Sequence, residues 1–263
     1  AEDHGKLGID RLLQPAIQLA KKGFVVAPRV ASDWARDADR LRPDAAARAT
    51  MLPRGKAPKA GDKIALPALA KALSAIAKHG PDPFYRGWIA ADMVRRLRAE
   101  GGLHRLEDFA RHEGEYAAPV AATYRGAKVW ECPPPGQGLT ALLMLNILGT
   151  MPAGDGPLSP ERCHLQIEAS KLAYADRDRH IADPDFAKIP VTRLLSAAHA
   201  KVQASRIDPM RAMAALPPAM PHPDTTYLTV VDKDRNAVSF INSVYWGFGS
   251  ARMAPKSGVL MQN

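Results

Sequence analysis

A pair of threonines, Thr225 and Thr226, follows a proline-rich stretch and opens a strand-like run, and their hydroxyls are the best placed to do chemistry. Prolines at 209, 217, 218, 221 and 223 predict an exposed loop over 207–224. A threonine hydroxyl is a poor nucleophile at neutral pH until a base accepts its proton, and a free α-amine, with a pKa of about 8, can be that base. Breaking the peptide bond between Asp224 and Thr225 would create such an amine.

The Thr225 hydroxyl could start that cleavage itself, by attacking the carbonyl carbon of Asp224 and shifting the acyl group from nitrogen to oxygen. The same oxygen would then act twice, first on the backbone and later on a substrate. Spacing alone leaves another interpretation open, because two threonines at the start of an edge strand are commonplace. His222, two residues before Asp224, could assist cleavage, although an exposed loop histidine is the simpler interpretation.

A hairpin must position Thr225. The runs 225–232 and 237–244 are rich in β-branched and aromatic residues, and a short charged turn at 233–235 separates them, which predicts an antiparallel pair of strands. The segment 247–263 has room for one more short strand. In the first half, apolar stripes that stop at glycines predict helices ending near Gly23, Gly80 and Gly101.

The middle of the chain mixes both kinds of element. Short β-prone runs at 120–124 and 127–131 predict a second pair of strands, and a buried helix is predicted over 139–148, after the PPPGQG loop at 133–138. That loop lacks the Lys-Ser/Thr of a phosphate loop. The longest helix is predicted to start at Ser159-Pro160-Glu161 and to stop at Asp183-Pro184.

The composition is that of a globular protein, with 46% apolar and 24% charged residues. No apolar stretch approaches the roughly 20 residues of a membrane-spanning helix, so no span is expected. The net charge of +9 raises the question of nucleic-acid binding, but the basic residues are spread along the chain. Their densest cluster is Arg95, Arg96 and Arg98, which we interpret as a solvated helix face, and no nucleic-acid partner is expected.

Cysteine and acidic residues give little support for a metal. Cys132 and Cys163 are the only cysteines, which excludes a disulfide framework and a cysteine-based zinc site. We interpret both as packed thiols, with a single bridge between them left open. A group of aspartates could suggest a cation, but the arginines among them and the Asp-Pro turn favour ion pairs and helix termination. These are Asp176, Asp178, Asp183 and Asp185.

The sequence of residues 224–250, DTTYLTVVDKDRNAVSFINSVYWGFGS, resembles the maturation site of gamma-glutamyltranspeptidases. Upstream stretches resemble the same family in its order and with its approximate spacing, over nearly all of the chain. They are HGKLGIDRLLQPAIQLAKKGF from His4, GPDPFYRGWIA from Gly80, GGLHRLEDFA from Gly101, YRGAKVWECPPPGQG from Tyr124 and EASKLAYADRDRHIADPDF from Glu168. Such collinearity is highly specific.

The resemblance implies an α+β fold, the αββα sandwich of N-terminal-nucleophile hydrolases. This chain would be a helix-rich central portion of it plus the first hairpin of the small subunit. Both subunits would come from one precursor by autocatalytic cleavage, with 1–224 belonging to the large subunit and 225–263 to the small one. The implied activity is gamma-glutamyl transfer or hydrolysis from glutathione-like amides through a threonine acyl-enzyme, without metal or cofactor.

The resemblance also assigns roles residue by residue. Thr225 matches the nucleophile, and Asp224 and Thr225 flank the cleavage site. Ser243 matches a hydroxyl position, often Thr in the family, that hydrogen-bonds the nucleophile; taken alone it could be a polar strand residue facing solvent. Tyr245 stands where well-studied members have an Asn that contacts the glutamyl group, so this substrate contact is expected to differ.

Two further departures are Tyr227, where many members have His, and Arg235, where Gly is usual. They resemble a bacterial branch that often favours hydrolysis over transfer. The family's other substrate contacts, an arginine, an acidic residue, a Ser-Ser pair and a Gly-Gly oxyanion hole, would lie outside the 263 residues. The family includes periplasmic and secreted members, and the first residues carry no signal-peptide pattern, which leaves the compartment open.

Two alternatives remain beside this expectation. A related acylase would use the same nucleophile on side-chain amides of the cephalosporin type. An incomplete, inactive relative would keep only a structural or binding role.

Overall fold

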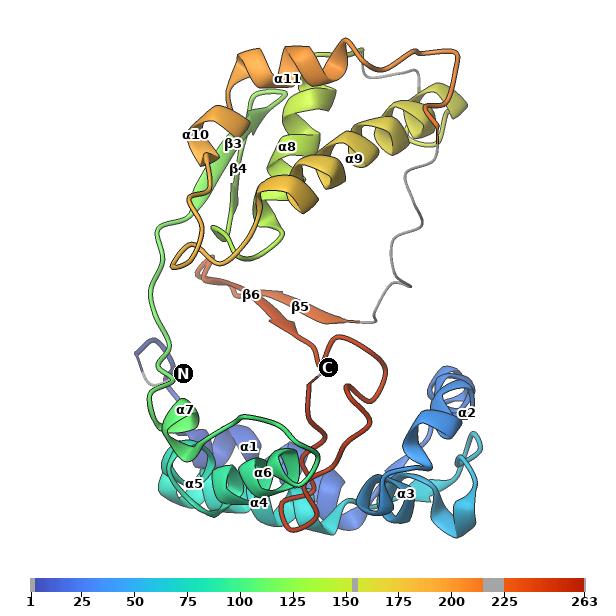
Figure 1. Cartoon of the computed structure of the whole chain (residues 1–263), viewed down its shortest axis with the longest axis vertical. Coiled ribbons are helices and arrows are strands. Elements are labelled where there is room, and N and C mark those ends of the chain that lie inside the picture. The colour runs from blue at the N-terminus through green and yellow to red at the C-terminus, as the bar shows by residue number, and fades with distance from the viewer. Residues whose placement is uncertain (1–2, 153–155, 215–224, 263) are drawn as a thin grey trace. The chain divides into compact units, whose positions relative to one another are not determined.

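The computed structural model describes residues 3–152, 156–214 and 225–262 (Figure 1). Contacts within the chain group the residues into two compact units, one formed by 1–113 with 221–263 and the other by 114–220. This grouping reflects packing, whereas the expected division after 224 reflects a break in the backbone. The division into subunits therefore stays a prediction.

The first unit is built mainly from helices. They are α1 (Ile9–Lys22), α2 (Pro28–Leu41), α3 (Ala45–Met51), α4 (Pro67–His79), α5 (Asp82–Tyr85), α6 (Trp88–Arg98) and α7 (Leu106–Ala110), with a 3₁₀ turn at Pro53–Gly55. The two-residue strands β1 (Phe24–Val25) and β2 (Lys63–Ile64) pair antiparallel, and α1 packs against α4.

The three helices predicted in this region are confirmed, including their glycine ends. Gly23 follows α1 with a φ of 89°, and Gly80 follows α4 with a φ of 69°. Glycine adopts this left-handed conformation without a side-chain clash, which is why it ends helices so often. α6 likewise stops shortly before Gly101 and Gly102.

The cluster Arg95, Arg96 and Arg98 does not form a uniformly solvated face, so that interpretation is wrong for one of its members. The Arg96 side chain is 20% exposed, and its Nη2 lies 2.5 Å from a carboxylate oxygen of Asp44, which is 1% exposed. A buried carboxylate requires such a partner. Helical spacing shows which residues share a face, but not which tertiary neighbour that face meets.

The segment 247–262 forms part of the first unit's core. Ala251 and Met253 pack into the cluster made by α2 and α3, and Ala254 and Met261 pack into the cluster made by α4 and α6. The short strand expected here is not formed; among the described residues of this segment, an isolated bridge joins Met253 to Leu260. Burial against the helices, rather than a strand ladder, shapes this segment.

The predicted hairpin is confirmed, with strands somewhat shorter than expected. β5 (Thr226–Val231) and β6 (Ala237–Asn242) pair antiparallel, with Thr226 opposite Asn242 and Val231 opposite Ala237. Asp232 organises the turn, because its Oδ1 accepts hydrogen bonds from the N–H groups of residues 234 and 236 at 2.9 Å. The Asn236 side-chain amide also donates to Asp232 Oδ2 at 2.9 Å, and this bond, followed by the backbone bonds, lowers the pKa of the Asp232 carboxyl.

Both faces of the hairpin carry exposed apolar side chains. Each is between 52% and 69% exposed: Tyr227, Leu228, Val230, Val231, Val238, Phe240 and Ile241. The chain mixes helices with three separate two-stranded sheets, so the α+β class is confirmed for the described residues. Because both faces of the ribbon are uncovered, the layered αββα sandwich is not assembled among the described residues. That this chain is one portion of such a sandwich stays a prediction.

The second unit combines the other predicted strands with helices. Its elements are β3 (Val120–Tyr124), β4 (Ala127–Glu131), α8 (Gly138–Gly149), α9 (Pro160–His180), α10 (Val191–Leu194) and α11 (Ala197–Ala204). β3 pairs antiparallel with β4, and α8 packs against α9 and β3. The pair of strands and the buried helix expected in this region are therefore confirmed.

The start of α9 follows the expected capping pattern. The Ser159 hydroxyl accepts a hydrogen bond from the Arg162 N–H at 3.2 Å, and Pro160 occupies the first turn. With 21 residues, α9 is the longest helix among the described residues, as predicted. It ends at His180, three residues before the expected stop at Asp183-Pro184.

One of the ion pairs predicted for the aspartates of this region is confirmed, at Asp178, whereas the interpretation of the cysteines is not. Asp176 accepts hydrogen bonds from the side chains of His199 and Gln203 at 2.6 and 2.8 Å, and Arg177 pairs with Asp178 at 2.6 Å. The interpretation of Cys132 as a packed thiol is wrong, because the residue follows the end of β4 and is exposed. Cys163 is partly exposed, and both thiols are free.

Candidate active site at Thr225

The hairpin register brings two candidate residues together. Because Thr226 pairs with Asn242, the next residue outward on each strand is Thr225 and Ser243. The Thr225 Oγ1 donates a hydrogen bond to the Ser243 Oγ at 3.0 Å. The two hydroxyls thus meet at the open end of the ribbon, opposite the turn.

Ser243 also connects to the third candidate, Tyr245. The Ser243 Oγ accepts a hydrogen bond from the Tyr245 N–H at 2.9 Å, so this oxygen accepts from both neighbours. Tyr245 has a φ of 73°, and its side chain is 41% exposed. A short side-chain-to-backbone bond of this kind holds a tight turn, which places Tyr245 one turn beyond the hydroxyl pair.

The face of the ribbon that carries Thr225 holds several other hydroxyls. Side chains alternate along a strand, so Thr225, Tyr227 and Thr229 share a face. On that face the Tyr227 hydroxyl and the Ser239 Oγ lie 2.6 Å apart. Tyr227 therefore directs its polar end toward the hairpin turn and away from Thr225.

The remaining candidates lie outside the described residues. Residues 215–224 hold Asp224, which precedes the expected cleavage point, together with His222 and most of the predicted proline-rich loop. In the described part of that loop, Met213 is attached to α9. Its N–H donates to a carboxylate oxygen of Glu168 at 2.9 Å, and Glu168 is 1% exposed.

A contact that sequence patterns do not predict anchors the segment beyond Tyr245. Asp92 in α6 is fully buried, and its Oδ2 accepts from the backbone of Lys256 at 2.9 Å and from that of Ser257 at 2.8 Å. The Ser257 hydroxyl donates to the same oxygen at 3.0 Å. One sequence signal points to this contact: Asp92 lies directly before Met93, in the apolar stripe of α6. A carboxylate that is buried at such a position needs hydrogen-bond partners.

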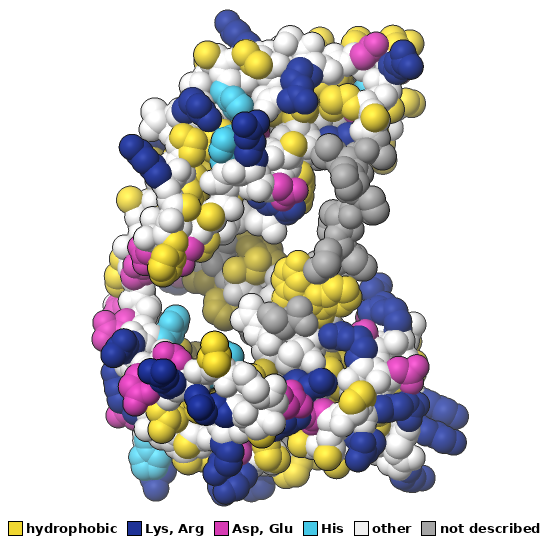
Figure 2. Space-filling model, viewed as in Figure 1, with side chains coloured by type: hydrophobic (Ala, Val, Ile, Leu, Met, Phe, Trp, Pro, Cys, Tyr) yellow, Lys and Arg dark blue, Asp and Glu magenta, His cyan; other side chains and the backbone are white. Residues whose placement is uncertain are grey.

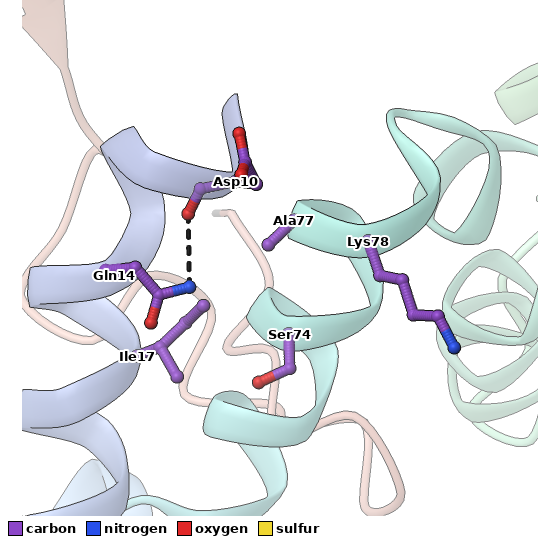
Figure 3. Close-up of a pocket in the computed structure, with 6 residues that line it drawn as sticks. All are labelled: Asp10, Gln14, Ile17, Ser74, Ala77 and Lys78. Carbon is purple, nitrogen blue, oxygen red and sulfur yellow. Dashed lines mark hydrogen bonds between the residues drawn. The ribbon is translucent and has the colours of Figure 1, made fainter. Parts of the chain in front are cut away.

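A hollow of about 550 Å³ lies between α1 and α4, away from these residues. Figure 3 shows its lining, with the Gln14 amide donating to the backbone carbonyl of Asp10 at 3.1 Å. Ile17, Ser74, Ala77 and Lys78 complete the lining. It contains none of Thr225, Ser243 and Tyr245, so it is separate from the candidate active site.

On the face drawn in Figure 2, Lys and Arg side chains are distributed widely, with acidic side chains among them. No group of three His, Cys, Asp or Glu side chains in the described ranges could hold a metal ion. Within the same ranges, every helix is too short or too polar to cross a membrane.

Comparison with known proteins identifies the family. The sequence model of Gamma-glutamyltranspeptidase matches residues 1–263. The glutathione hydrolase-like YwrD proenzyme of Bacillus subtilis (strain 168) is 38% identical over 263 residues, which cover 100% of this chain and 50% of that protein. The glutathione hydrolase proenzyme of Escherichia coli (strain K12) is 34% identical, with 100% of this chain and 47% of that protein covered.

A solved structure is similar along the whole chain. The crystal structure of cephalosporin acylase from Bacillus halodurans superposes with a TM-score of 0.90 at 35% identity, covering 100% of this chain and 49% of that one. These similarities place the chain in the N-terminal-nucleophile hydrolase superfamily. The chain belongs to the gamma-glutamyltranspeptidase family, which confirms the resemblance seen in the sequence. It spans about half the length of these relatives.

Proposed function

We propose that Thr225, once freed by cleavage of the Asp224–Thr225 bond, is the nucleophile of an enzyme that hydrolyses or transfers gamma-glutamyl groups from glutathione-like amides. The observation that supports this most is the 3.0 Å hydrogen bond between the Thr225 and Ser243 hydroxyls in a chain of this family. A nucleophilic hydroxyl with a neighbour that fixes its orientation is the arrangement that acyl transfer requires.

Maturation comes first in the proposed sequence. The Thr225 Oγ1 attacks the carbonyl carbon of Asp224, the C–N bond breaks, and an ester to Oγ1 replaces the amide. Water then hydrolyses the ester, which leaves a carboxylate on Asp224 and a free α-amine on Thr225. Large and small subunits result, and the nucleophile now carries its own base.

Turnover uses the same oxygen. The α-amine takes the proton of Oγ1 while Oγ1 attacks the amide carbonyl of the substrate, and that proton then passes to the departing amine. The acyl-enzyme is released by water in hydrolysis or by an acceptor amine in transfer. In this scheme Ser243 orients the hydroxyl of Thr225, and Tyr245 contacts the acyl part of the substrate.

A specific observation favours a second candidate, an acylase that cleaves side-chain amides of the cephalosporin type. The structure of the Bacillus halodurans cephalosporin acylase matches all of this chain with a TM-score of 0.90, and Tyr245 replaces the Asn expected at a glutamyl contact. A phenol in place of an amide offers apolar surface to a less polar acyl group. Nucleophile and cleavage are the same in both candidates.

The test is made in the full-length protein, with maturation followed on gels and turnover by release of a gamma-glutamyl anilide and of a cephalosporin side chain. Thr225→Ala is expected to abolish both maturation and turnover, whereas Thr225→Ser keeps some of each. Ser243→Ala removes one supporting hydrogen bond, worth about 1 to 2 kcal/mol, and should slow turnover by roughly 5- to 30-fold.

Thr226→Ala is the matched control, because this neighbouring threonine points to the opposite face of the strand and should change little. Preference for one of the two substrates decides between the two candidates. Subunit formation or normal turnover by Thr225→Ala would refute the assignment of the nucleophile. A full-length protein without maturation or turnover would favour the inactive relative.

A further inference from the structure

The turn that follows the hydroxyl pair, defined here as residues 244–251, has a strained backbone. Tyr245, Phe248 and Ala251 have φ values of 73°, 58° and 56°, and none of them is a glycine. Left-handed conformations are costly for residues with a Cβ, and they persist only where the surroundings impose them.

Arg40, near the end of α2, makes the long-range contact that holds the turn. Its Nη1 donates to the carbonyl oxygen of Gly247 at 2.7 Å, and its Nη2 donates to that of Gly249 at 2.6 Å. The guanidinium also lies over the Trp246 ring, 5.4 Å from the centroid. A planar fork that binds two carbonyls and an aromatic face fixes both the position and the orientation of the turn.

The two glycines of the turn allow close packing against their neighbours. A Cβ on Gly247 would lie 2.5 Å from a carboxylate oxygen of Asp37, which itself pairs with Arg40 at 3.5 Å. A Cβ on Gly249, whose φ is 55°, would overlap the carbonyl oxygen of Met261. Gly247 thus leaves room for α2 beside the turn, and Gly249 leaves room for the backbone of Met261.

The contact also connects the two sides of the expected cleavage point. Arg40 lies before residue 225 and the turn lies after it. Arg40 and Gly247 are 207 positions apart in the sequence. Ser243 directly precedes the turn, and its Oγ accepts hydrogen bonds from both Thr225 Oγ1 and the Tyr245 N–H. A displacement of the turn would therefore move the oxygen that orients the nucleophile.

We propose that Arg40 is a positioning residue for the nucleophile: by holding the turn 244–251 across the cleavage point, it keeps Ser243 in hydrogen-bonding reach of Thr225. This inference rests on the proposed function of Thr225. Arg40 itself touches neither substrate nor the reacting atoms. Its effect passes through the turn and Ser243, which distinguishes it from a residue that only stabilises the fold.

The experiment uses the full-length protein and kinetics normalised to the number of active sites. Arg40→Gln is expected to lower kcat for the gamma-glutamyl anilide by about 5- to 30-fold, the effect proposed for Ser243→Ala, with a smaller change in KM. Arg40→Lys keeps the charge but loses the fork, and should fall between the parent and Arg40→Gln. Arg42→Gln is the matched control, since Arg42 makes an ion pair with Asp39 and a bond to the Gly55 carbonyl, both at 2.9 Å and both away from the turn.

Combination with Ser243→Ala separates positioning from general stabilisation. If Arg40 acts through Ser243, the double variant should be within about twofold of Ser243→Ala alone, because interactions in series are not additive. Losses that multiply would overturn the inference, and so would an Arg40→Gln variant that behaves like Arg42→Gln.

A second measurement does not depend on turnover. In the Thr225→Ala background, amide hydrogen exchange at Gly249 and Ala251 should be at least about tenfold faster with Arg40→Gln than with Arg42→Gln. Equal exchange would overturn the inference even if the variant enzyme could not be assayed. A parent protein that neither matures nor turns over would instead refute the proposed function, so the two failures are distinct.

Discussion

Replacement of Asp92 by alanine should destabilise the protein, because this buried carboxylate connects two segments of the first unit. The Asp92 side chain is fully buried in α6, and its Oδ2 accepts three hydrogen bonds from residues 256 and 257. Its Oδ1 lies 3.3 Å from Arg95 Nη2. These bonds attach the segment 247–262 to the helices.

The magnitude follows from what the substitution leaves behind. Lys256 is exposed, so its freed N–H can bind water. Ser257 is fully buried, so its N–H and hydroxyl would lose their partner without replacement, at about 1 to 3 kcal/mol each. The expected cost of Asp92→Ala is therefore about 2 to 6 kcal/mol. Asp92→Asn keeps an acceptor oxygen and should cost about 1 to 2 kcal/mol, because bonds to a neutral oxygen are weaker.

Urea denaturation of the chain, followed by circular dichroism, measures these free energies of unfolding. Asp82→Ala is the control: this carboxylate on α5 is 69% exposed and pairs with Arg86 at 3.2 Å, so its loss should cost less than about 1 kcal/mol. If Asp92→Ala costs no more than Asp82→Ala, residues 256 and 257 are not held by α6 and the reasoning fails.

Three further changes test other contacts. Burial raises the pKa of the Asp44 carboxyl, but hydrogen bonds from the backbone and from Arg96 outweigh it and hold the pKa below its usual value. This stabilisation should be present above a pH of about 4 and be lost as the pH falls through the lowered pKa. In urea titrations, the free energy of unfolding of the parent should fall over this pH range, and that of Asp44→Asn should fall less. Gly249→Ala places a Cβ against the Met261 carbonyl at a φ of 55°, so thermal unfolding should show a loss of at least about 1 kcal/mol. Glu168→Gln removes a buried charge that binds an ammonium group and a backbone N–H, and should cost the second unit about 1 to 3 kcal/mol in urea; an unchanged midpoint would contradict this.

Local patterns determined most of the elements and the place of the hydroxyl pair. Glycines with left-handed φ end α1 and α4 where the sequence predicts, since that conformation is a property of the residue itself. A short turn fixes the register of β5 and β6, so Ser243 opposite Thr225 follows from neighbours in sequence. The family could also be identified from the sequence. Matching segments that follow one another in the family's order can be recognised without knowing any tertiary contact.

Some elements escaped these patterns although their signal is present. α2 buries Trp34, Ala38 and Leu41 at helical spacing. Five charged residues in the stretch DWARDADRL, residues 33–41, obscure this stripe. Cys132 looked like a core thiol because free cysteines are usually buried. Only the end of β4, where the chain leaves the sheet, made it exposed.

The contacts that hold the site in place were decided by tertiary structure alone. Arg40 meets Gly247 across 207 positions, and Asp92 meets Ser257 across 165. Periodicity and turn chemistry describe residues within a few positions of one another, whereas these partners meet only after the helices have packed and the segment 247–262 has entered their core. The sequence could therefore place the nucleophile on its hairpin, but the packing of distant segments determined which arginine holds the turn beside it.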